Sequence, residues 1–87
     1  MSKEDPPLLN IIARAPFETY YEGPAEAISA VNRIGPFDVL PEHADFFSIL
    51  KPCEVFIDVP DKDPVTFHVH NGIITVRDNE VMLFCNM

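Results

Sequence analysis

An 87-residue chain is long enough for one domain with a single modest core, and no apolar run approaches the ~20 residues of a transmembrane helix. Fourteen acidic and six basic side chains give a net charge of −8, and the basic residues are scattered along the chain. Binding to nucleic acid or to an anionic membrane needs clustered Lys and Arg, so the composition argues against both partners. Residues 1–7 end in two prolines without an apolar signal core, and we expect them to be a disordered lead.

In the first half of the chain, prolines and glycines separate short segments that are typical of strands joined by turns. Residues 8–14 and 17–21 are predicted strands, and residues 22–24 (Glu-Gly-Pro) are predicted to turn the chain. Two later segments are ambiguous. Residues 24–31 contain helix-forming residues after a proline but also fit a strand, and composition slightly favours the helix. Residues 41–50 also fit a short helix.

The second half of the chain alternates apolar and polar residues with the period of two that a half-buried strand requires. Strands are predicted over residues 53–59, 65–70, 73–77 and 80–86. They are joined by a polar loop at residues 60–64, an Asn71-Gly72 turn and a two-residue Asp78-Asn79 hairpin. So many short strands predict an all-β domain in which two packed sheets, or a flattened barrel, bury the apolar faces.

Three histidines are the best candidates for a metal site. His68 and His70 are two residues apart on a predicted strand, so both imidazoles share one face, about 6.5–7 Å apart along the chain. With His43 as a third ligand they could hold a metal ion, but a solvated strand face has the same pattern and is favoured. The acidic segment 58–63 lacks the ligand spacing and the turn glycine of a calcium loop, so we expect a plain acidic loop.

The candidate nucleophiles do not indicate an enzyme. Ser2, Ser29 and Ser48 lie outside any glycine elbow, and the chain has no glycine-rich phosphate loop. A sandwich core of this size leaves little room for a pocket that buries a substrate. Cys53 and Cys85 lie in apolar, strand-like surroundings, where we expect reduced thiols of a cytosolic protein, with one disulfide as the alternative. We therefore expect no catalytic residue and no cofactor.

A motif in the middle of the chain gives the clearest indication of function. Residues 35–52 read Gly-x-Phe-x-Val-Leu-Pro-x-His-Ala, followed by an apolar run and Lys-Pro. Residues 71–84 carry a second motif, Asn-Gly-Ile-Ile-Thr-Val-Arg-Asp-Asn-Glu-Val-Met-Leu-Phe, and residues 21–23 (Tyr-Glu-Gly) carry a third. Together these motifs resemble the N-terminal β-sandwich domain of the F-type ATP synthase epsilon subunit. The resemblance runs from Leu9 to the last residue.

The resemblance implies a flattened antiparallel β-sandwich of about ten short strands over residues 8–87, with residues 25–31 as a strand. It implies a non-catalytic central-stalk subunit of the rotor, which couples the c-ring and the gamma subunit in proton-driven ATP synthesis. Such a subunit is peripheral, on the cytoplasmic side of the membrane and without direct membrane insertion, and its isolated domain is expected to be a monomer. The C-terminal helical hairpin with which the family usually continues is not part of these residues.

The resemblance also implies two contact regions. In the family, one face of the sandwich packs on the gamma subunit, and loops at one end rest on the c-ring. Carried over by position, the expected contacts with the c-ring are Pro36, Phe37, Pro41, Glu42 and His43. Prolines in these loops fix φ and so supply the stiffness that transmission of torque requires.

The chain departs from the family pattern at several positions. Asp38, Glu42 and Cys53 stand where glycine is usual, Asp45 where proline is usual, and Asn71 at the first glycine of a usual pair. Glycine permits unusual backbone angles, which Asn tolerates better than most other residues. These departures, with their added negative charge, favour one alternative: an epsilon-like sandwich that serves as an interaction module outside the synthase. A small metal-binding β protein that uses the three histidines is a more distant alternative.

Overall fold

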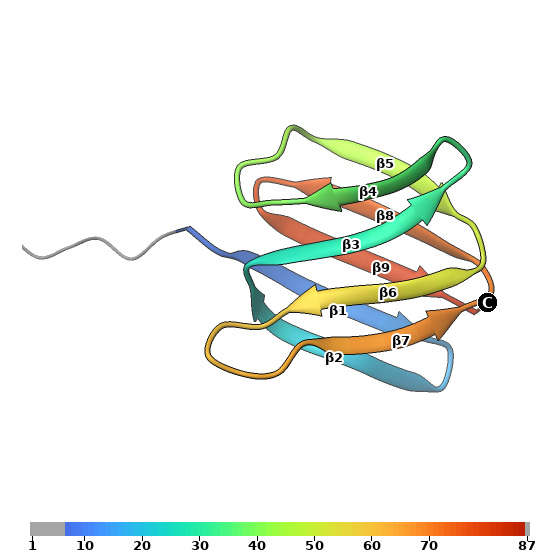
Figure 1. Ribbon diagram of the computed structural model, residues 1–87, viewed down its shortest axis with the longest axis horizontal. Coiled ribbons are helices and arrows are strands. Elements are labelled where there is room, and N and C mark those ends of the chain that lie inside the picture. Colours follow the sequence, from blue (N-terminus) through green and yellow to red (C-terminus); the bar gives the residue numbers. More distant parts are fainter. Residues whose placement is uncertain (1–6, 87) are drawn as a thin grey trace, which may run out of the picture.

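The computed structural model describes residues 7–86, and this part of the chain is all-β, as predicted (Figure 1). It forms nine strands, one fewer than the resemblance implies. Among these residues there is no helix with the length and apolar character to cross a membrane. The expected lead, residues 1–7, lies outside the described residues except for Pro7. The strands are β1 (Leu9–Ala15), β2 (Glu18–Ala25), β3 (Ala27–Asn32), β4 (Gly35–Val39), β5 (Phe46–Leu50), β6 (Cys53–Asp58), β7 (Val65–Val69), β8 (Gly72–Arg77) and β9 (Glu80–Cys85).

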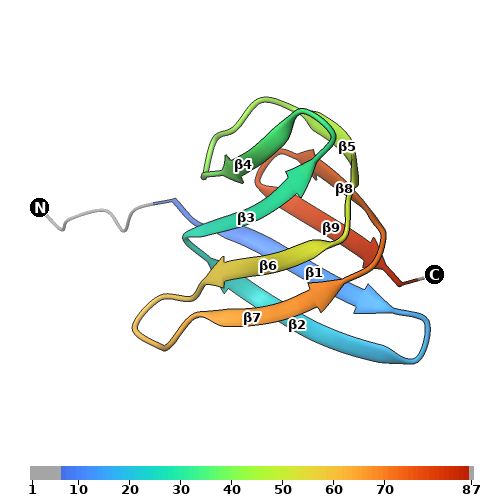
Figure 2. The same ribbon diagram turned by 45° about the vertical axis from the view of Figure 1, so that its right-hand side comes forward.

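The strands form one hydrogen-bonded path that doubles back into two layers (Figures 1 and 2). The order is β2-β1-β9-β8-β5-β3-β6-β7, with β4 paired to β3. We call β2, β1, β9, β8 and β5 the β9 layer, and β4, β3, β6 and β7 the β3 layer. The path crosses between the layers at one pair, Asn32 opposite Leu50. The strand pairs in the described part of the chain are antiparallel, except that β1 and β9 run parallel.

The two edge strands of the path, β2 and β7, meet without a hydrogen-bonded ladder. Tyr20 on β2 stacks on Phe67 of β7, with ring centroids 4.4 Å apart and ring planes 6° from parallel. Asn86 Nδ2 donates a hydrogen bond to Tyr20 Oη at 3.1 Å. Side-chain contacts therefore hold this edge of the sandwich together.

Strand alternation fills the space between the layers with apolar side chains. No polar or charged side chain is buried within residues 7–86, so the core contains no desolvated charge. Full burial of one Val, Leu or Ile side chain contributes about 1.5–3 kcal/mol to the stability of the fold. The largest fully buried side chains are Leu9, Ile11, Ile28, Ile57, Ile74, Leu83, Val39, Val55, Val69, Val81 and Cys85.

The predicted turn at residues 22–24 is wrong, because these residues continue β2 as far as Ala25. Gly23, with φ of 151°, lies opposite Ile11, and Pro24 lies opposite Asn10. Since β2 is an edge strand, a proline there does not remove a hydrogen bond to a second neighbour. The turn residues are therefore accommodated inside a strand.

The two ambiguous segments contain strands, as the resemblance implied for the first of them. In β3, Ile28 and Ala30 are buried while their neighbours are half-buried, which is the period of a strand. Residues 46–50 form β5, so the helical alternative is wrong in both places. Burial between the layers outweighs local helix propensity. The hairpin prediction is confirmed, since Asp78 and Asn79 have φ of 51° and 66°.

The connections between strands gather at two ends of the sandwich (Figure 1). One end, which we call the acidic end, carries residues 40–45, the β6–β7 loop and the β8–β9 turn. Its acidic residues are Glu26, Glu42, Asp45, Asp58, Asp61, Asp63, Asp78 and Glu80. The opposite end carries the β1–β2 and β3–β4 turns, with Arg14, Arg33 and Lys51 on or beside its connections. The fold thus concentrates the negative charge at one end.

Candidate protein-binding face

The outer face of the β9 layer is apolar. Phe47 and Ile49 on β5 are 64% and 63% exposed, and Met82 and Phe84 on β9 are each 39% exposed. Residues directly opposite each other in a sheet share a face. The register therefore places Phe47, Thr75, Met82 and Ile12 in one row, and Ile49, Ile73, Phe84 and Arg14 in the next. We call Ile12, Phe47, Ile49, Ile73, Met82 and Phe84 the apolar face. A contiguous exposed apolar patch is typical of a binding surface.

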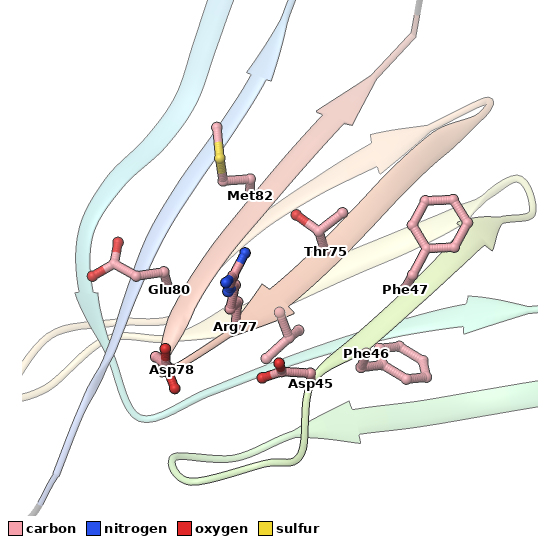
Figure 3. Close-up of a pocket in the computed structure, with 9 residues that line it drawn as sticks. Asp45, Phe46, Phe47, Thr75, Arg77, Asp78, Glu80 and Met82 are labelled. Carbon is pink, nitrogen blue, oxygen red and sulfur yellow. The ribbon is translucent and has the colours of Figure 1, made fainter.

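A groove of about 710 Å³ opens where the apolar face meets the acidic end (Figure 3). Figure 3 shows Phe47, Thr75 and Met82 along one side of the groove. Asp45, Asp78 and Glu80 line the other side, and Arg77 lies between the two sides. The groove therefore offers apolar contacts and negative charge to the same occupant.

The outer face of the β3 layer is polar. Ser29 Oγ donates a hydrogen bond to Asp38 Oδ1 at 2.7 Å. Glu54 Oε2 lies 3.9 Å from His68 Nδ1, and both side chains are largely exposed. Phe56 is the exposed large apolar side chain on β3, β4, β6 and β7, all of which lie within the described range. This face is that of an ordinary solvated sheet.

The five residues expected to contact the c-ring lie toward the two ends of β4. Pro36 and Phe37 are near its start, beside the β3–β4 turn. Pro41, Glu42 and His43 follow its end, in the loop at the acidic end. Pro36 and Glu42 are exposed, and the other three are half-buried. The structure does not bring the five residues together on one surface.

The ring of His43 is held against β5 rather than standing free in solvent. Its centroid is 5.4 Å from that of Phe46, which in turn is 5.3 Å from that of Phe37. Nδ1 of His43 lies 2.7 Å from the carbonyl oxygen of Ala44. The His43 N–H donates to the carbonyl oxygen of Leu40 at 3.1 Å. These contacts make the loop stiff.

Glu42 and Asp38, which both stand at usual glycine positions, have different backbone conformations. Glu42 has φ of 69°, in the left-handed region that favours glycine, and its N–H donates to Asn79 Oδ1 at 2.6 Å. Asp38 lies in β4 opposite Ser29, without a positive φ. Replacement of the glycine therefore strains the backbone at residue 42 and not at residue 38.

The histidines do not come together as a trio. His68 lies on β7 and His70 follows the end of that strand, and their ring centroids are 5.1 Å apart in an edge-to-face arrangement. Within residues 7–86, no group of three or more His, Cys, Asp or Glu side chains has an arrangement that could hold a metal ion. His43 is therefore not a third ligand for the pair.

The candidate nucleophiles in the described range are occupied or shielded. Ser29 donates to Asp38, and Ser48 Oγ accepts a hydrogen bond from Asn32 Nδ2 at 3.0 Å. Cys53 and Cys85 are free thiols, as expected, which removes the disulfide alternative. Burial raises the pKa of the Cys85 thiol, which keeps it protonated and weakens it as a nucleophile.

Sequence reasoning missed the apolar face, although β5 and β9 carry a signal for it. Phe47 and Ile49 stand between inward-facing residues of β5, and Met82 and Phe84 do so on β9. A strand that is apolar at both odd and even positions has both faces suited to burial. Because the core accounts for only one face, the second face indicates a partner.

Comparison with known proteins identifies the family. Residues 9–87 match the family model of the ATP synthase delta/epsilon chain, β-sandwich domain. The ATP synthase epsilon chain of Ruthia magnifica is 33% identical over 67 residues, which are 77% of this chain and 48% of the relative. The epsilon chain of Nitratiruptor sp. is 30% identical over 60 residues, or 69% of this chain and 46% of the relative. The chain thus spans about half the length of these relatives.

Solved structures share the fold. A chain in the mitochondrial ATP synthase of Euglena gracilis, solved as an OSCP/F1/c-ring assembly, has a TM-score of 0.85 and 17% identity. The match covers 100% of this chain and 56% of that one. A chain of the Tetrahymena thermophila central stalk and c-ring has a TM-score of 0.74 and 16% identity, over 88% of this chain and 62% of that one. With the family match over nearly its whole length, this chain belongs to the ATP synthase delta/epsilon β-sandwich family.

Proposed function

We propose that this chain is the β-sandwich domain of an epsilon-type central-stalk subunit, a non-catalytic part of the ATP synthase rotor. In this role it links the gamma subunit to the c-ring, peripherally on the cytoplasmic side of the membrane. The observation that carries the proposal is the apolar outer face of the β9 layer, on a domain of this family. A rigid sandwich with one unpaired apolar face suits a protein that holds two neighbours in fixed positions.

The gamma subunit is the proposed occupant of the apolar face. Phe47 and Ile49 keep most of their surface in contact with water, which is costly for side chains of this size. Aromatic residues and Met are enriched at the centres of protein interfaces, as on this face. The outer face of the β3 layer lacks such a cluster, so the gamma subunit is expected on one side of the sandwich only.

The proposed contact with the c-ring is the β3–β4 turn, at the opposite end from the acidic loops. Ile34 at this turn is 94% exposed, and Pro36 beside it is also exposed. The loop with Pro41, Glu42 and His43 instead adjoins the groove through Asp45, so it is proposed to lie near the gamma subunit. The residues expected at the c-ring are thus divided between the two partners. Single cysteines that replace Ile34 and Glu42 test this by cross-linking in an assembled rotor.

The main test is co-elution of the purified chain with the gamma subunit of the same organism at micromolar concentrations. Phe47→Ser/Phe84→Ser is expected to abolish co-elution while the thermal unfolding midpoint stays near that of the wild type. Phe56→Ser on the polar face is the matched control and is expected to co-elute. If the folded wild-type chain does not bind the gamma subunit, or if Phe56→Ser is as damaging as the double variant, the proposal fails. Absence of binding between the folded wild-type chain and the gamma subunit supports the alternative of an interaction module outside the synthase.

A further inference from the structure

We propose that the groove beside the apolar face selects a partner segment in which a Lys or Arg side chain extends from apolar neighbours. This inference rests on the proposed function, because it specifies the part of the gamma subunit that the groove receives. The side chain is expected to lay its methylene groups on Phe47 and Met82 and to place its cation among the carboxylates of Asp45, Asp78 and Glu80. Long basic side chains commonly bind in this amphipathic way.

The groove geometry fits such a side chain. Phe47 and Met82 flank Thr75, which lies opposite both of them in the register of β5, β8 and β9. Two residues further along β8, toward the acidic end, Arg77 lies opposite Glu80 at the β8–β9 turn. Figure 3 shows Phe47, Thr75 and Met82 on one side, Asp45, Asp78 and Glu80 on the other, and Arg77 between them. An occupant therefore meets both kinds of surface at once.

The charge of the groove is unbalanced. Three carboxylates line it against one guanidinium, and no ion pair within 4.0 Å involves any of these four groups among residues 7–86. Glu80 Oε1 accepts a hydrogen bond of 3.3 Å from Asn10 Nδ2. Because the amide donor is neutral, this bond does not cancel the charge of Glu80. A partner cation that enters the groove reduces this excess from two negative charges to one. Such a charge contributes selectivity and association rate more than raw affinity.

Asp45 makes the selection particular to this chain. Proline is usual at this position in the family pattern that the sequence resembles. In this chain the position carries a carboxylate, which directly precedes β5 and lines the groove. The apolar residues provide a surface that any apolar partner can cover, whereas Asp45 favours a partner with a matching base. We therefore expect the chain to prefer its own gamma subunit over one that lacks this base.

The experiment measures the affinity of the 87-residue chain for its gamma subunit by calorimetry, from about 50 to 500 mM NaCl. Asp45→Asn/Glu80→Gln removes two charges from the groove and keeps oxygen acceptors in place. Asp58→Asn/Asp63→Asn removes the same number of charges from the β6–β7 loop region and is the matched control. The groove variant is expected to bind about fivefold to thirtyfold more weakly at low salt, with a flatter dependence on salt. The control is expected to match the wild type.

The outcomes separate this inference from the proposed function. If the groove variant and the control bind equally well and show the same salt dependence, the inference is overturned while the stalk function stands. If the wild-type chain does not bind at any salt concentration, the proposed function fails with it. Thermal unfolding of each variant shows whether it is folded, and Asp45→Lys, which changes a single exposed side chain, repeats the test with reversed charge. Unchanged binding by folded Asp45→Lys also overturns the inference.

Discussion

The two outer faces of the sandwich belong to sheets of similar construction but have opposite chemistry. On the β9 layer, Phe47 and Ile49 continue an apolar surface onto β8 and β9. On the β3 layer, the corresponding positions carry polar pairs such as Ser29 with Asp38 and Glu54 with His68. Both layers share the same core, so fold stability does not require the difference. The difference is the one expected if a partner covers the apolar face, as proposed, while the polar face stays in contact with water.

The largest expected effect separates the inner from the outer side of β9. Leu83→Ala leaves a cavity in the core and is expected to lower the free energy of unfolding by about 2–5 kcal/mol. Phe84→Ser, one residue further along on the apolar face, is expected to cost less than about 1 kcal/mol. Urea denaturation followed by circular dichroism measures both values. Equal losses would mean that Phe84 belongs to the core and that the apolar face is not a free surface.

The next effect concerns the edge at which the two layers meet without a ladder. Phe67→Ala removes the stacking on Tyr20 and is expected to cost about 2 kcal/mol, because an aromatic pair adds to the loss of buried area. Phe56→Ala on the neighbouring strand provides the comparison, with an expected loss below about 1 kcal/mol. The same urea titration applies. A smaller loss for Phe67→Ala than for Phe56→Ala contradicts the role given to this edge.

Two substitutions that restore glycine are expected to have opposite signs. Asp38→Gly removes the hydrogen bond from Ser29 and loosens a regular strand, at a cost of about 1–2 kcal/mol. Glu42→Gly relieves the left-handed backbone at φ of 69° and is expected to stabilise the fold by up to about 1 kcal/mol. Thermal melts of the two variants decide the matter. A destabilised Glu42→Gly would show that the Glu42 side chain contributes contacts that outweigh the strain.

The smallest expected effect tests whether the polar face is only a solvated surface. His68→Gln is expected to change the free energy of unfolding by less than about 0.5 kcal/mol. Addition of about 100 µM Zn²⁺ is expected to leave the unfolding midpoint of the wild type unchanged, because a ligand stabilises only a fold that binds it. Differential scanning fluorimetry measures both. A midpoint that rises with Zn²⁺ in the wild type but not in His68→Gln supports the metal-binding alternative.

The sequence predicts the fold where one strand period or one turn dominates. Val55 and Ile57 alternate with polar residues on β6, and Asp78-Asn79 tolerates the positive φ of a tight hairpin, so both predictions hold. Prediction fails at Pro24, where an edge position makes a turn residue acceptable in a strand, because edge positions are set by tertiary pairing. The family motif located the loop with His43, but the separation of Pro36 from that loop depends on the path of β4 through space. The apolar face could not be predicted for a related reason, because the neighbours that pair with a strand decide which of its side chains are exposed.

The parallel pairing of β1 with β9 has a consequence for how this molecule comes into being. Asn10 lies beside Glu80, so the centre of the β9 layer joins the first strand of the domain to the last. Contacts of such long sequence separation form late in folding, since the entropy cost of closing a large loop comes before the stabilisation that the contacts provide. Because Met82 and Phe84 lie on β9, the apolar face is complete only after this strand has been synthesised and has paired with β1 and β8.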